Sequence, residues 1–205
     1  MSAPRRNIRL SNLEEALRSG GVVLCATDTV YGLAVMPGFA DSSNEVYRLK
    51  GRSTGRPLPV MVADPDDLRG LGVAVNEPAR RLLDSGLMPG PLTLALGFDD
   101  ERPRPSWLAG RVEVAVRLPA ASPVRDLVSG CGPLLVTSAN YTDRPTPSRV
   151  DEILAMLDGE PAAVLDSGPC HEVPSTLVNC NLESPVVERV GAVPRETIEE
   201  LLSGL

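Results

Sequence analysis

The chain has 205 residues and a mass of 21.7 kDa, which fits a single domain that buries roughly 70% of its unfolded surface. Its net charge of −7 and pI near 4.8 have the wrong sign for a protein whose main task is to grip a nucleic-acid backbone. Apolar residues make up 42% and charged residues 23%, an ordinary composition for a folded protein, so we expect one α/β domain over residues 1–205.

The first predicted elements are a helix and a buried strand. Residues 11–14, Ser-Asn-Leu-Glu, have the form of a capping box, and the helix they begin carries Leu13 and Leu17 inward. Gly20-Gly21 then ends the helix. The apolar run Val22–Ala26 has the length of a strand and is bounded by glycines and by polar residues, which is typical of a buried strand.

A polar cluster, Thr-Asp-Thr-Val-Tyr-Gly-Leu at residues 27–33, follows that strand directly. Open α/β sheets bind ligands at the carboxyl ends of their strands, so the hydroxyls and the carboxylate of this cluster are well placed to line a pocket. The alternative is a plain turn that Thr and Asp side chains stabilise. The cluster alone favours neither interpretation.

The only lysine of the chain, Lys50, lies near the end of a helix that is predicted to begin at residues 42–45. The other 19 basic residues are arginine, so this lysine indicates a specific role. Arg52 and Arg56 follow on a short segment that contains two glycines. Lysine supplies a mobile point charge and arginine a bidentate fork, and phosphate or carboxylate ligands commonly use both. The segment therefore predicts an anion site, with a basic surface loop as the alternative.

The middle of the chain alternates predicted strands with helix starts. Leu58–Val62 is a strand in which Pro59 indicates an edge position or an irregular start. Acidic helix starts that contain proline occur at residues 64–67 and 76–78. Two more strands are predicted at residues 92–96 and 112–117, and the polar, proline-rich loop between them covers residues 99–110.

A second apolar strand, Pro133–Val136, runs into another small polar cluster that contains Thr137, Ser138 and Asn140. Two strands that each deliver such a cluster favour one shared pocket. The remaining predictions are a helix from residue 148 to residue 157, strands at residues 162–166 and 174–178, an arginine beside a glycine turn at residues 189–191, and a closing helix over residues 195–202.

Cysteine content and hydropathy bear on the cellular compartment. No apolar run approaches the eighteen or so residues that a membrane span needs, and no apolar stretch follows the first six residues, so we expect a cytoplasmic protein. Cys25, Cys131, Cys170 and Cys180 form no C-x-x-C pair, and His171 is the sole histidine. Buried free thiols are therefore favoured over a zinc site.

Seven motifs, taken in order, resemble the YrdC/TsaC-like threonylcarbamoyl-AMP synthases over nearly the whole chain. They are residues 27–33, Lys50-Gly51-Arg52 with Pro57-Leu58, residues 89–93 (Pro-Gly-Pro-Leu-Thr), Arg117-Leu118-Pro119, residues 137–140 (Thr-Ser-Ala-Asn), Ser175-Thr176, and Arg189 before Gly191. Each motif is weak, but seven in the right order are specific. The resemblance implies a twisted, mostly mixed α/β sheet with flanking helices around a large open cavity, in the short form without an extra C-terminal domain.

What the family resemblance implies is an enzyme that joins L-threonine, bicarbonate (as carbon dioxide) and ATP into threonylcarbamoyl-AMP and releases pyrophosphate. A separate transferase would use the product to form threonylcarbamoyladenosine in tRNA, so tight tRNA binding by this chain alone is not expected. Mg²⁺ is expected with ATP, held mainly by the phosphates. No G-x-x-x-x-G-K-[ST] motif occurs, so ATP binding would not use a P-loop.

The resemblance also implies roles for individual residues, although no protein ligands for a metal. Lys50 and Arg52 are carried over as the catalytic residues, at the ATP phosphates and the carbamate. The residues carried over to threonine and its carbamate are Thr29, Tyr31, Arg117 and Ser175. The residues carried over to ATP are Lys50, Arg52, Thr137, Ser138, Asn140 and Arg189, and Arg56 is assigned to ATP on its charge.

Two departures from the family pattern affect the predicted site. Met61 stands where some relatives have a histidine that helps to hold threonine, and a thioether cannot make that contact. Arg56 replaces the usual lysine or asparagine, so its role rests on charge alone. The alternatives are a carbamoyl-adenylating relative, an RNA-binding or ribosome-associated module, and an inactive relative. Net charge and the scarcity of aromatic residues argue against the RNA-binding module.

Overall fold

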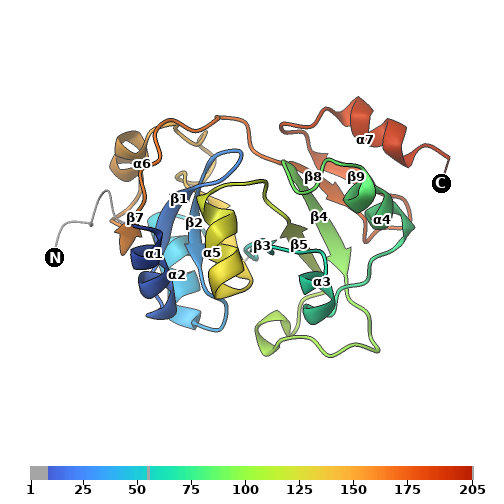
Figure 1. The fold of residues 1–205 in the computed structure, drawn as a ribbon, viewed down its shortest axis with the longest axis horizontal. Helices are drawn as coiled ribbons and strands as arrows, with labels where there is room; N and C mark the ends of the chain where they lie inside the picture. Colours follow the sequence, from blue (N-terminus) through green and yellow to red (C-terminus); the bar gives the residue numbers. More distant parts are fainter. Residues whose placement is uncertain (1–8, 55, 205) are drawn as a thin grey trace.

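The structure is a computed structural model, and it describes residues 9–54 and 56–204. The strands are β1 (Val23–Ala26), β2 (Tyr31–Val35), β3 (Val60–Met61), β4 (Leu92–Gly97), β5 (Glu113–Arg117), β6 (Leu134–Ser138), β7 (Ala163–Val164), β8 (Thr176–Asn179) and β9 (Val186–Arg189). Within these residues they form one sheet in the order β7-β1-β2-β6-β3-β5-β4-β8-β9 (Figure 1). The sheet is mixed, because β1–β7, β3–β5 and β4–β8 are parallel and the other neighbours are antiparallel.

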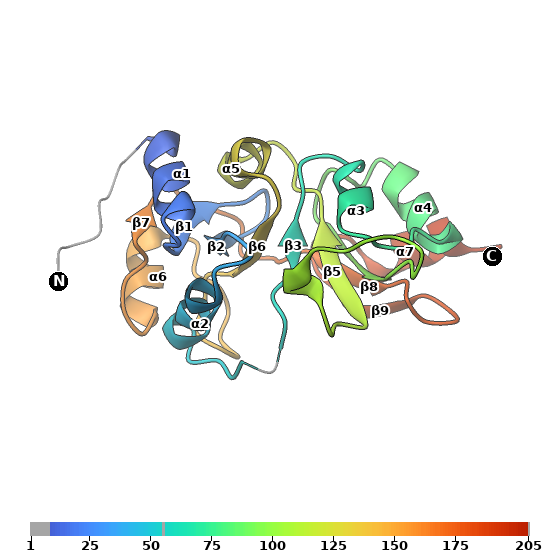
Figure 2. The ribbon, with the colours of Figure 1, turned by 90° about the horizontal axis from the view of Figure 1, so that it is seen from below.

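Helices flank this sheet on both faces. They are α1 (Leu10–Arg18), α2 (Ala40–Leu49), α3 (Asp67–Gly70), α4 (Glu77–Asp84), α5 (Pro123–Cys131), α6 (Val150–Met156) and α7 (Arg195–Leu202), with a short 3₁₀ helix at Ser106–Leu108. Figure 2 shows α1 and α5 on one face of the sheet, and α2 and α6 on the other. The predicted α/β class, with a mixed sheet and flanking helices, is confirmed.

The core follows from the alternation of side chains along the strands. Cys25 points toward α1 and α5, where it packs in a cluster with Leu17 and Leu127. Its neighbour Leu24 points to the other face and packs in a second cluster with Val46 of α2. Because both faces are covered by helices, β1 is apolar at every position, and this is why it was recognisable as a buried strand.

The N-terminal helix begins differently from the prediction. Its N-cap is Arg9, whose backbone N–H donates to Asn12 Oδ1 at 3.1 Å. The predicted capping box at residues 11–14 is therefore wrong, because Ser11 already lies inside the helix. The predicted inward face is confirmed, since Leu13 and Leu17 are fully buried.

Strand β3 lies in the middle of the sheet. Val60 pairs with Val116 of β5 on one side and with Leu135 of β6 on the other. An edge position for this strand is thus wrong, whereas an irregular start is confirmed. The proline stands just before the strand, where its carbonyl still accepts from Val136 N at 3.0 Å.

Two strands and one α-helix were not predicted, and the 3₁₀ helix at Ser106–Leu108 lies within a predicted loop. Strand β2 was hidden within the polar cluster, and β9 was read only as an arginine beside a turn. Helix α5 begins with Pro123 at its first helical position, after Ser122 as N-cap, which is a recognisable start signal. The other strands and helices occur where the sequence predicted them, with ends shifted by a few residues.

The cysteine side chains and the helix lengths bear on the predictions about zinc and membranes. All four cysteines are free thiols; Cys25 and Cys180 are buried, as predicted, whereas Cys131 and Cys170 are partly exposed. Burial raises the pKa of Cys25 and of Cys180 to about 12, which keeps both thiols protonated. Within residues 9–54 and 56–204, no helix is long and apolar enough to cross a membrane, and no cluster of three or more His, Cys, Asp or Glu side chains is placed to hold a metal ion.

Candidate functional site

A pocket of about 120 Å³ opens on one face of the central strands. Its position follows from strand register, because residues that face each other across a sheet point to the same side. The paired positions that line the pocket are Gly32 with Ser138, Met61 with Arg117, and Leu177 with Arg189. The β1–β2 turn, β4 and the segment before β8 complete its wall, through Thr27 and Thr29, Thr93, and Ser175 respectively.

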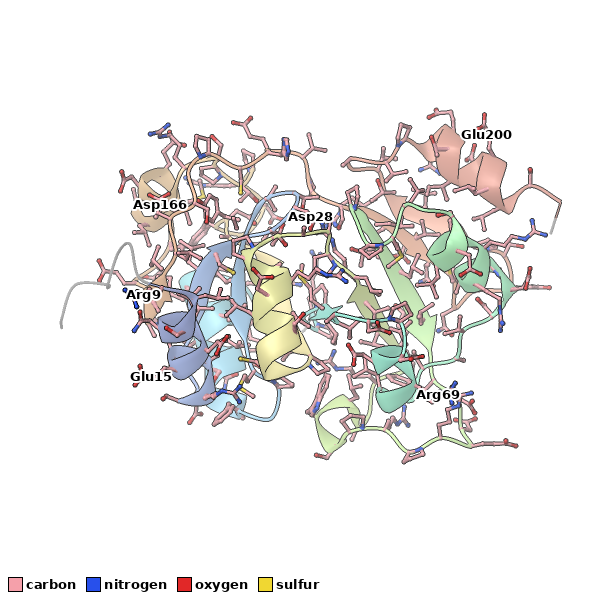
Figure 3. The ribbon with its side chains drawn as sticks, in the orientation of Figure 1. Arg9, Glu15, Asp28, Arg69, Asp166 and Glu200 are labelled. Atoms are coloured by element: carbon pink, nitrogen blue, oxygen red, sulfur yellow. The ribbon has the colours of Figure 1, made fainter. Side chains whose placement is uncertain are left out.

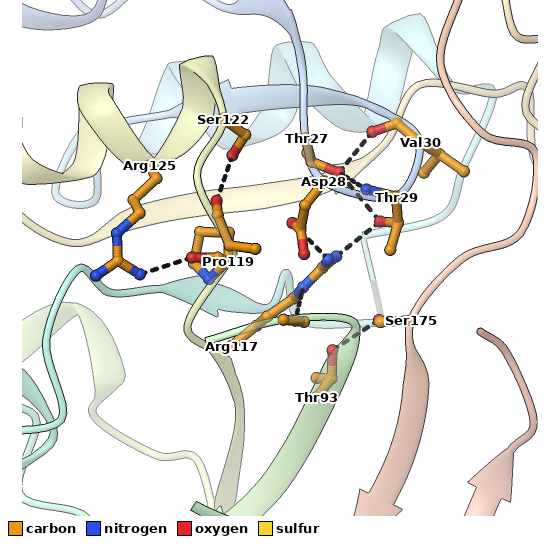
Figure 4. Close-up of polar contacts among 12 residues, drawn as sticks. Thr27, Asp28, Thr29, Val30, Thr93, Arg117, Pro119, Ser122, Arg125 and Ser175 are labelled. Atoms are coloured by element: carbon orange, nitrogen blue, oxygen red, sulfur yellow. Dashed lines mark hydrogen bonds and ion pairs between the residues drawn. The ribbon is translucent and has the colours of Figure 1, made fainter. Parts of the chain in front are cut away.

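Arg117 is held in this pocket by two parts of the chain, the β1–β2 turn and the turn before β4 (Figure 4). Its Nε donates to Gly90 O at 3.1 Å, Nη1 to Thr29 Oγ1 at 2.9 Å, and Nη2 to Asp28 Oδ1 at 2.7 Å. A guanidinium has five N–H groups, so one on each terminal nitrogen is left for a ligand. Two N–H groups of one guanidinium can bind a carboxylate as a fork.

Asp28 and Arg117 form a buried ion pair. Their side chains are 9% and 5% exposed, and Figure 3 shows Asp28 near the middle of the molecule, in contrast to Glu15 and Glu200 at its ends. Burial lowers the pKa of Arg117, and the nearby Asp28 carboxylate opposes that shift. Asp28 Oδ2 is buried and accepts no hydrogen bond from any residue that the structure describes. The carboxylate therefore has one firm partner, Arg117.

Arg189 approaches the same pocket from β9. Its Nη2 donates to Ser175 O at 2.9 Å and to Ser175 Oγ at 3.2 Å. Ser175 Oγ also lies 2.8 Å from Thr93 Oγ1. Burial and the positive charge of Arg117 lower the pKa of Arg189, which indicates that the two guanidinium groups share one site. An anion between them would relieve their repulsion.

Gly191 allows this arrangement because two backbone segments touch there. A Cβ atom at Gly191 would lie 2.2 Å from Pro174 O and 2.6 Å from Ser175 O. No side chain fits in that space, which gives a physical reason for the glycine after Arg189.

We therefore expect Gly191→Ala to lower the free energy of unfolding by about 1–3 kcal/mol, because the added methyl group must displace backbone rather than a mobile side chain. Urea unfolding at equilibrium measures this. The control is Gly70→Ala in α3, where an added Cβ meets no atom within 4 Å. Equal stability of the two variants would contradict the close packing of Gly191 on Ser175.

Tyr31 lines the pocket, but its hydroxyl is already engaged. The Oη donates to Gly168 O at 2.7 Å and accepts from Ser167 N at 3.0 Å. Burial raises the pKa of Tyr31 to about 12. The predicted contact between Tyr31 and threonine would therefore use the ring or the backbone of Tyr31 and not its hydroxyl.

Lys50 is buried, 3% exposed, at the C-cap of α2. Its Nζ donates to Ser138 O, to Asn140 O at 2.8 Å and to Asn140 Oδ1 at 3.2 Å. Three acceptors need three donors, which only the charged ammonium has. Burial and the nearby Arg52 nevertheless lower the pKa of Lys50 to about 7. Lys50 thus joins α2 to the loop after β6 and lies behind the pocket residue Ser138.

Arg52 and Arg56 lie on the loop after Lys50 and outside the residues that line the pocket. Arg52 is half-buried, and its guanidinium lies 6.0 Å from the centroid of the Tyr47 ring. Burial lowers the pKa of Arg52, and Arg56 lowers it further through its positive charge. Arg52 also lowers the pKa of Lys50, so neighbouring cations of this segment lie near one another, and their binding of an anion stays a prediction.

The structure thus divides the predicted site residues into two groups. One group lines the pocket and consists of Thr29, Tyr31, Thr137, Ser138, Arg117, Ser175 and Arg189, together with Met61. The other group lies on the loops beside it and consists of Lys50, Arg52, Arg56 and Asn140. Arg189, predicted with the ATP group, lies with Arg117 and Ser175.

Thr27, Asp28 and Thr93 were given no individual role by sequence reasoning. Side chains alternate between the two faces along β4, which places Thr93 on the same face as Ala95. This alternation was the signal in the sequence that could have singled out Thr93.

Comparison with known proteins identifies the family. The family described as Sua5/YciO/YrdC, telomere recombination, matches residues 15–191. The chain belongs to this family. It is 34% identical to the threonylcarbamoyl-AMP synthase of Bacillus subtilis over 188 residues, which cover 91% of this chain and 54% of the relative. It is 36% identical to the mouse threonylcarbamoyl-AMP synthase over 174 residues, 84% of this chain and 59% of the relative.

The fold of the family is seen in the crystal structure of Pyrococcus abyssi Sua5 complexed with L-threonine. That structure superposes with a TM-score of 0.85 at 28% identity, over 98% of this chain and 61% of the Sua5 chain. The chain therefore spans little more than half the length of these relatives. The shared part contains every strand of the sheet and both groups of predicted site residues.

Proposed function

We propose that this protein is an L-threonylcarbamoyladenylate synthase, a nucleotidyltransferase that acts on L-threonine, bicarbonate and ATP. The observation that carries the proposal is the pocket itself, where the free N–H groups of Arg117 lie beside Arg189 and Thr29. This combination of cationic donors and a hydroxyl suits a small α-amino acid. The names of the relatives support the same substrate and the same reaction.

The proposed reaction has two steps. The amine of threonine adds to carbon dioxide and loses a proton, which gives a carbamate. A carbamate oxygen then attacks the α-phosphorus of ATP, the bond to the bridging oxygen breaks, and pyrophosphate leaves with that electron pair. The carbamate is itself the nucleophile, so the protein supplies position and charge.

The site must overcome repulsion among its own substrates, because the carboxylate, the carbamate and the triphosphate are all anionic. A pocket of about 120 Å³ is below the size of typical sites for larger ligands, so it suits the amino acid. We place the triphosphate outside it, along Arg52 and Arg56, with the buried Lys50 ammonium acting through its charge from behind Ser138. These cations would stabilise the charge that builds on the α-phosphate and on departing pyrophosphate.

Mg²⁺ is proposed to enter with ATP and to be held by the phosphates, since this hard ion prefers oxygen ligands and keeps several of its waters. The product would pass to a separate transferase that modifies tRNA. We further propose that the protein acts in the cytoplasm and binds tRNA weakly by itself, in line with its net charge of −7.

The proposal predicts that the purified protein releases pyrophosphate when it is given ATP, Mg²⁺, L-threonine and bicarbonate. Omitting threonine should reduce the release to background, because the carbamate nucleophile cannot form without its amine. A coupled pyrophosphate assay measures the rate, and mass spectrometry identifies threonylcarbamoyl-AMP. Turnover that does not depend on threonine, or no turnover under any of these conditions, would reject the assignment.

A further inference from the structure

The β1–β2 turn contains a chain of hydroxyl groups whose hydrogen-bond directions are fixed. Thr27 Oγ1 lies 2.7 Å from Val30 O, and a carbonyl can only accept, so Thr27 donates its single hydroxyl proton there. Thr29 N donates to Thr27 Oγ1 at 3.0 Å. The oxygen of Thr27 is therefore left with acceptor capacity only.

The direction of the next hydrogen bond follows. Thr27 Oγ1 and Thr29 Oγ1 are 3.0 Å apart. Since the proton of Thr27 is committed to Val30, Thr29 must donate its hydroxyl proton to Thr27. Arg117 Nη1 donates to Thr29 Oγ1 from the other side (Figure 4). Thr29 thus presents one remaining lone pair and no proton to the pocket.

This polarity decides what a ligand can place against Thr29. A carboxylate oxygen there would meet only lone pairs, whereas an N–H or O–H group would find an acceptor. The two free N–H groups of Arg117 have the opposite preference and require an acceptor. Thr27 is 8% exposed and lines the pocket itself, so this setting is built into its wall.

We propose that Thr27 is a positioning residue of the amino-acid site, which fixes the Thr29 hydroxyl as an acceptor and so orients the substrate. The amino acid binds with its amine toward Thr29 and its carboxylate toward Arg117 and Arg189. This inference rests on the proposed function, and it adds the orientation of the substrate and the residue that imposes it.

Thr27→Val tests the proposal, because valine keeps the shape of threonine and removes the hydroxyl. Without its acceptor, the Thr29 proton is free to turn into the pocket, where it opposes the amine. We expect the KM and the Kd for L-threonine to rise about tenfold, the loss of roughly one good hydrogen bond, with kcat and the KM for ATP within twofold of wild type. Thr27→Ser, which keeps the hydroxyl, should restore both threonine constants.

Two further measurements separate orientation from a general loss of structure. The first is the affinity for 3-hydroxybutyrate, which lacks the amine; Thr27→Val should leave it unchanged, so the preference for threonine over this analogue falls about tenfold. The second is Ser42→Ala, a control that removes another buried hydroxyl, one that donates to Gly20 O far from the pocket. Ser42→Ala should leave all the substrate constants unchanged.

The outcomes are distinct. A threonine Kd for Thr27→Val within twofold of wild type would overturn the inference, as would a parallel loss of affinity for threonine, 3-hydroxybutyrate and ATP. Wild-type protein that neither binds threonine by calorimetry nor turns it over would instead remove the proposed function.

Discussion

Replacing Lys50 with methionine should reduce kcat by about 100-fold or more, the loss seen when a single preorganised charge is removed from a transition state. Methionine fills nearly the same volume, which matters because Lys50 is buried and bonded to Ser138 and Asn140. Either substitution leaves the acceptors of Ser138 and Asn140 without their donor, but alanine would add a cavity, so Lys50→Met removes the charge with the smaller change in packing. Pyrophosphate release under saturating substrates measures the effect.

The pH dependence provides the control for charge. With its pKa lowered to about 7, Lys50 is charged below pH 7 and loses its charge above it. We expect kcat/KM for ATP to fall as pH rises from 7 to 8.5, and Lys50→Arg to flatten this decline, since arginine stays charged.

Between pH 7 and about 10.4 the folded state binds fewer protons at Lys50 than the unfolded state does. The free energy of unfolding should therefore rise with pH in this range, and Lys50→Met should remove that rise. Full activity of Lys50→Met would contradict the assigned role.

The second large effect is expected for Arg117→Met. This change removes the carboxylate fork and leaves the carboxylate of Asp28 buried beside an apolar side chain. We expect a loss of about 3–5 kcal/mol in the free energy of unfolding, and loss of measurable threonine binding. Urea unfolding and calorimetry measure the two effects separately.

A double-mutant cycle identifies the cause of the instability. Asp28→Asn in the Arg117→Met background removes the unpaired charge, so the double variant should regain part of the lost stability but none of the threonine binding. If the double variant is as unstable as Arg117→Met, the buried charge is not the cause. Arg117→Lys keeps the charge without the planar fork, and it should also bind threonine more weakly than wild type.

Much of the fold was predictable because local signals and burial agree in it. Strands β1 and β6 are apolar runs bounded by glycine or by polar clusters, and α4 begins at Asn76, whose side chain accepts from Ala79 N at 3.1 Å. Where the two kinds of signal disagreed, prediction failed. Strand β2 begins at Tyr31 inside a polar cluster, and Pro59 favoured an edge for a strand that lies at the centre.

The candidate site was predictable as a set of residues but not as an arrangement. Family motifs selected Thr29, Arg117 and Arg189. Strand register brings Arg117 and Arg189 to one face, and the β1–β2 turn brings Thr29 beside Arg117. The direction of the Thr27 hydroxyl depends on a distance to a backbone carbonyl, which no residue pattern encodes. The partition of the cations into pocket and loop groups likewise depends on how α2 meets the loop after β6.

The shortness of β3 has a consequence for how the two halves of the molecule communicate. Ser138 of β6 and Thr29 of the β1–β2 turn lie on one side of β3, and Arg117 of β5 and Ser175, just before β8, lie on the other. Strand β3 joins the two sides through only two paired residues on each side. A substrate that bonds Thr29 and Arg117 together therefore acts as an additional cross-link across the narrowest part of the sheet. Part of the free energy of substrate binding then stabilises the pairing of β3 with its neighbours. The sheet should therefore be more rigid when the pocket is occupied.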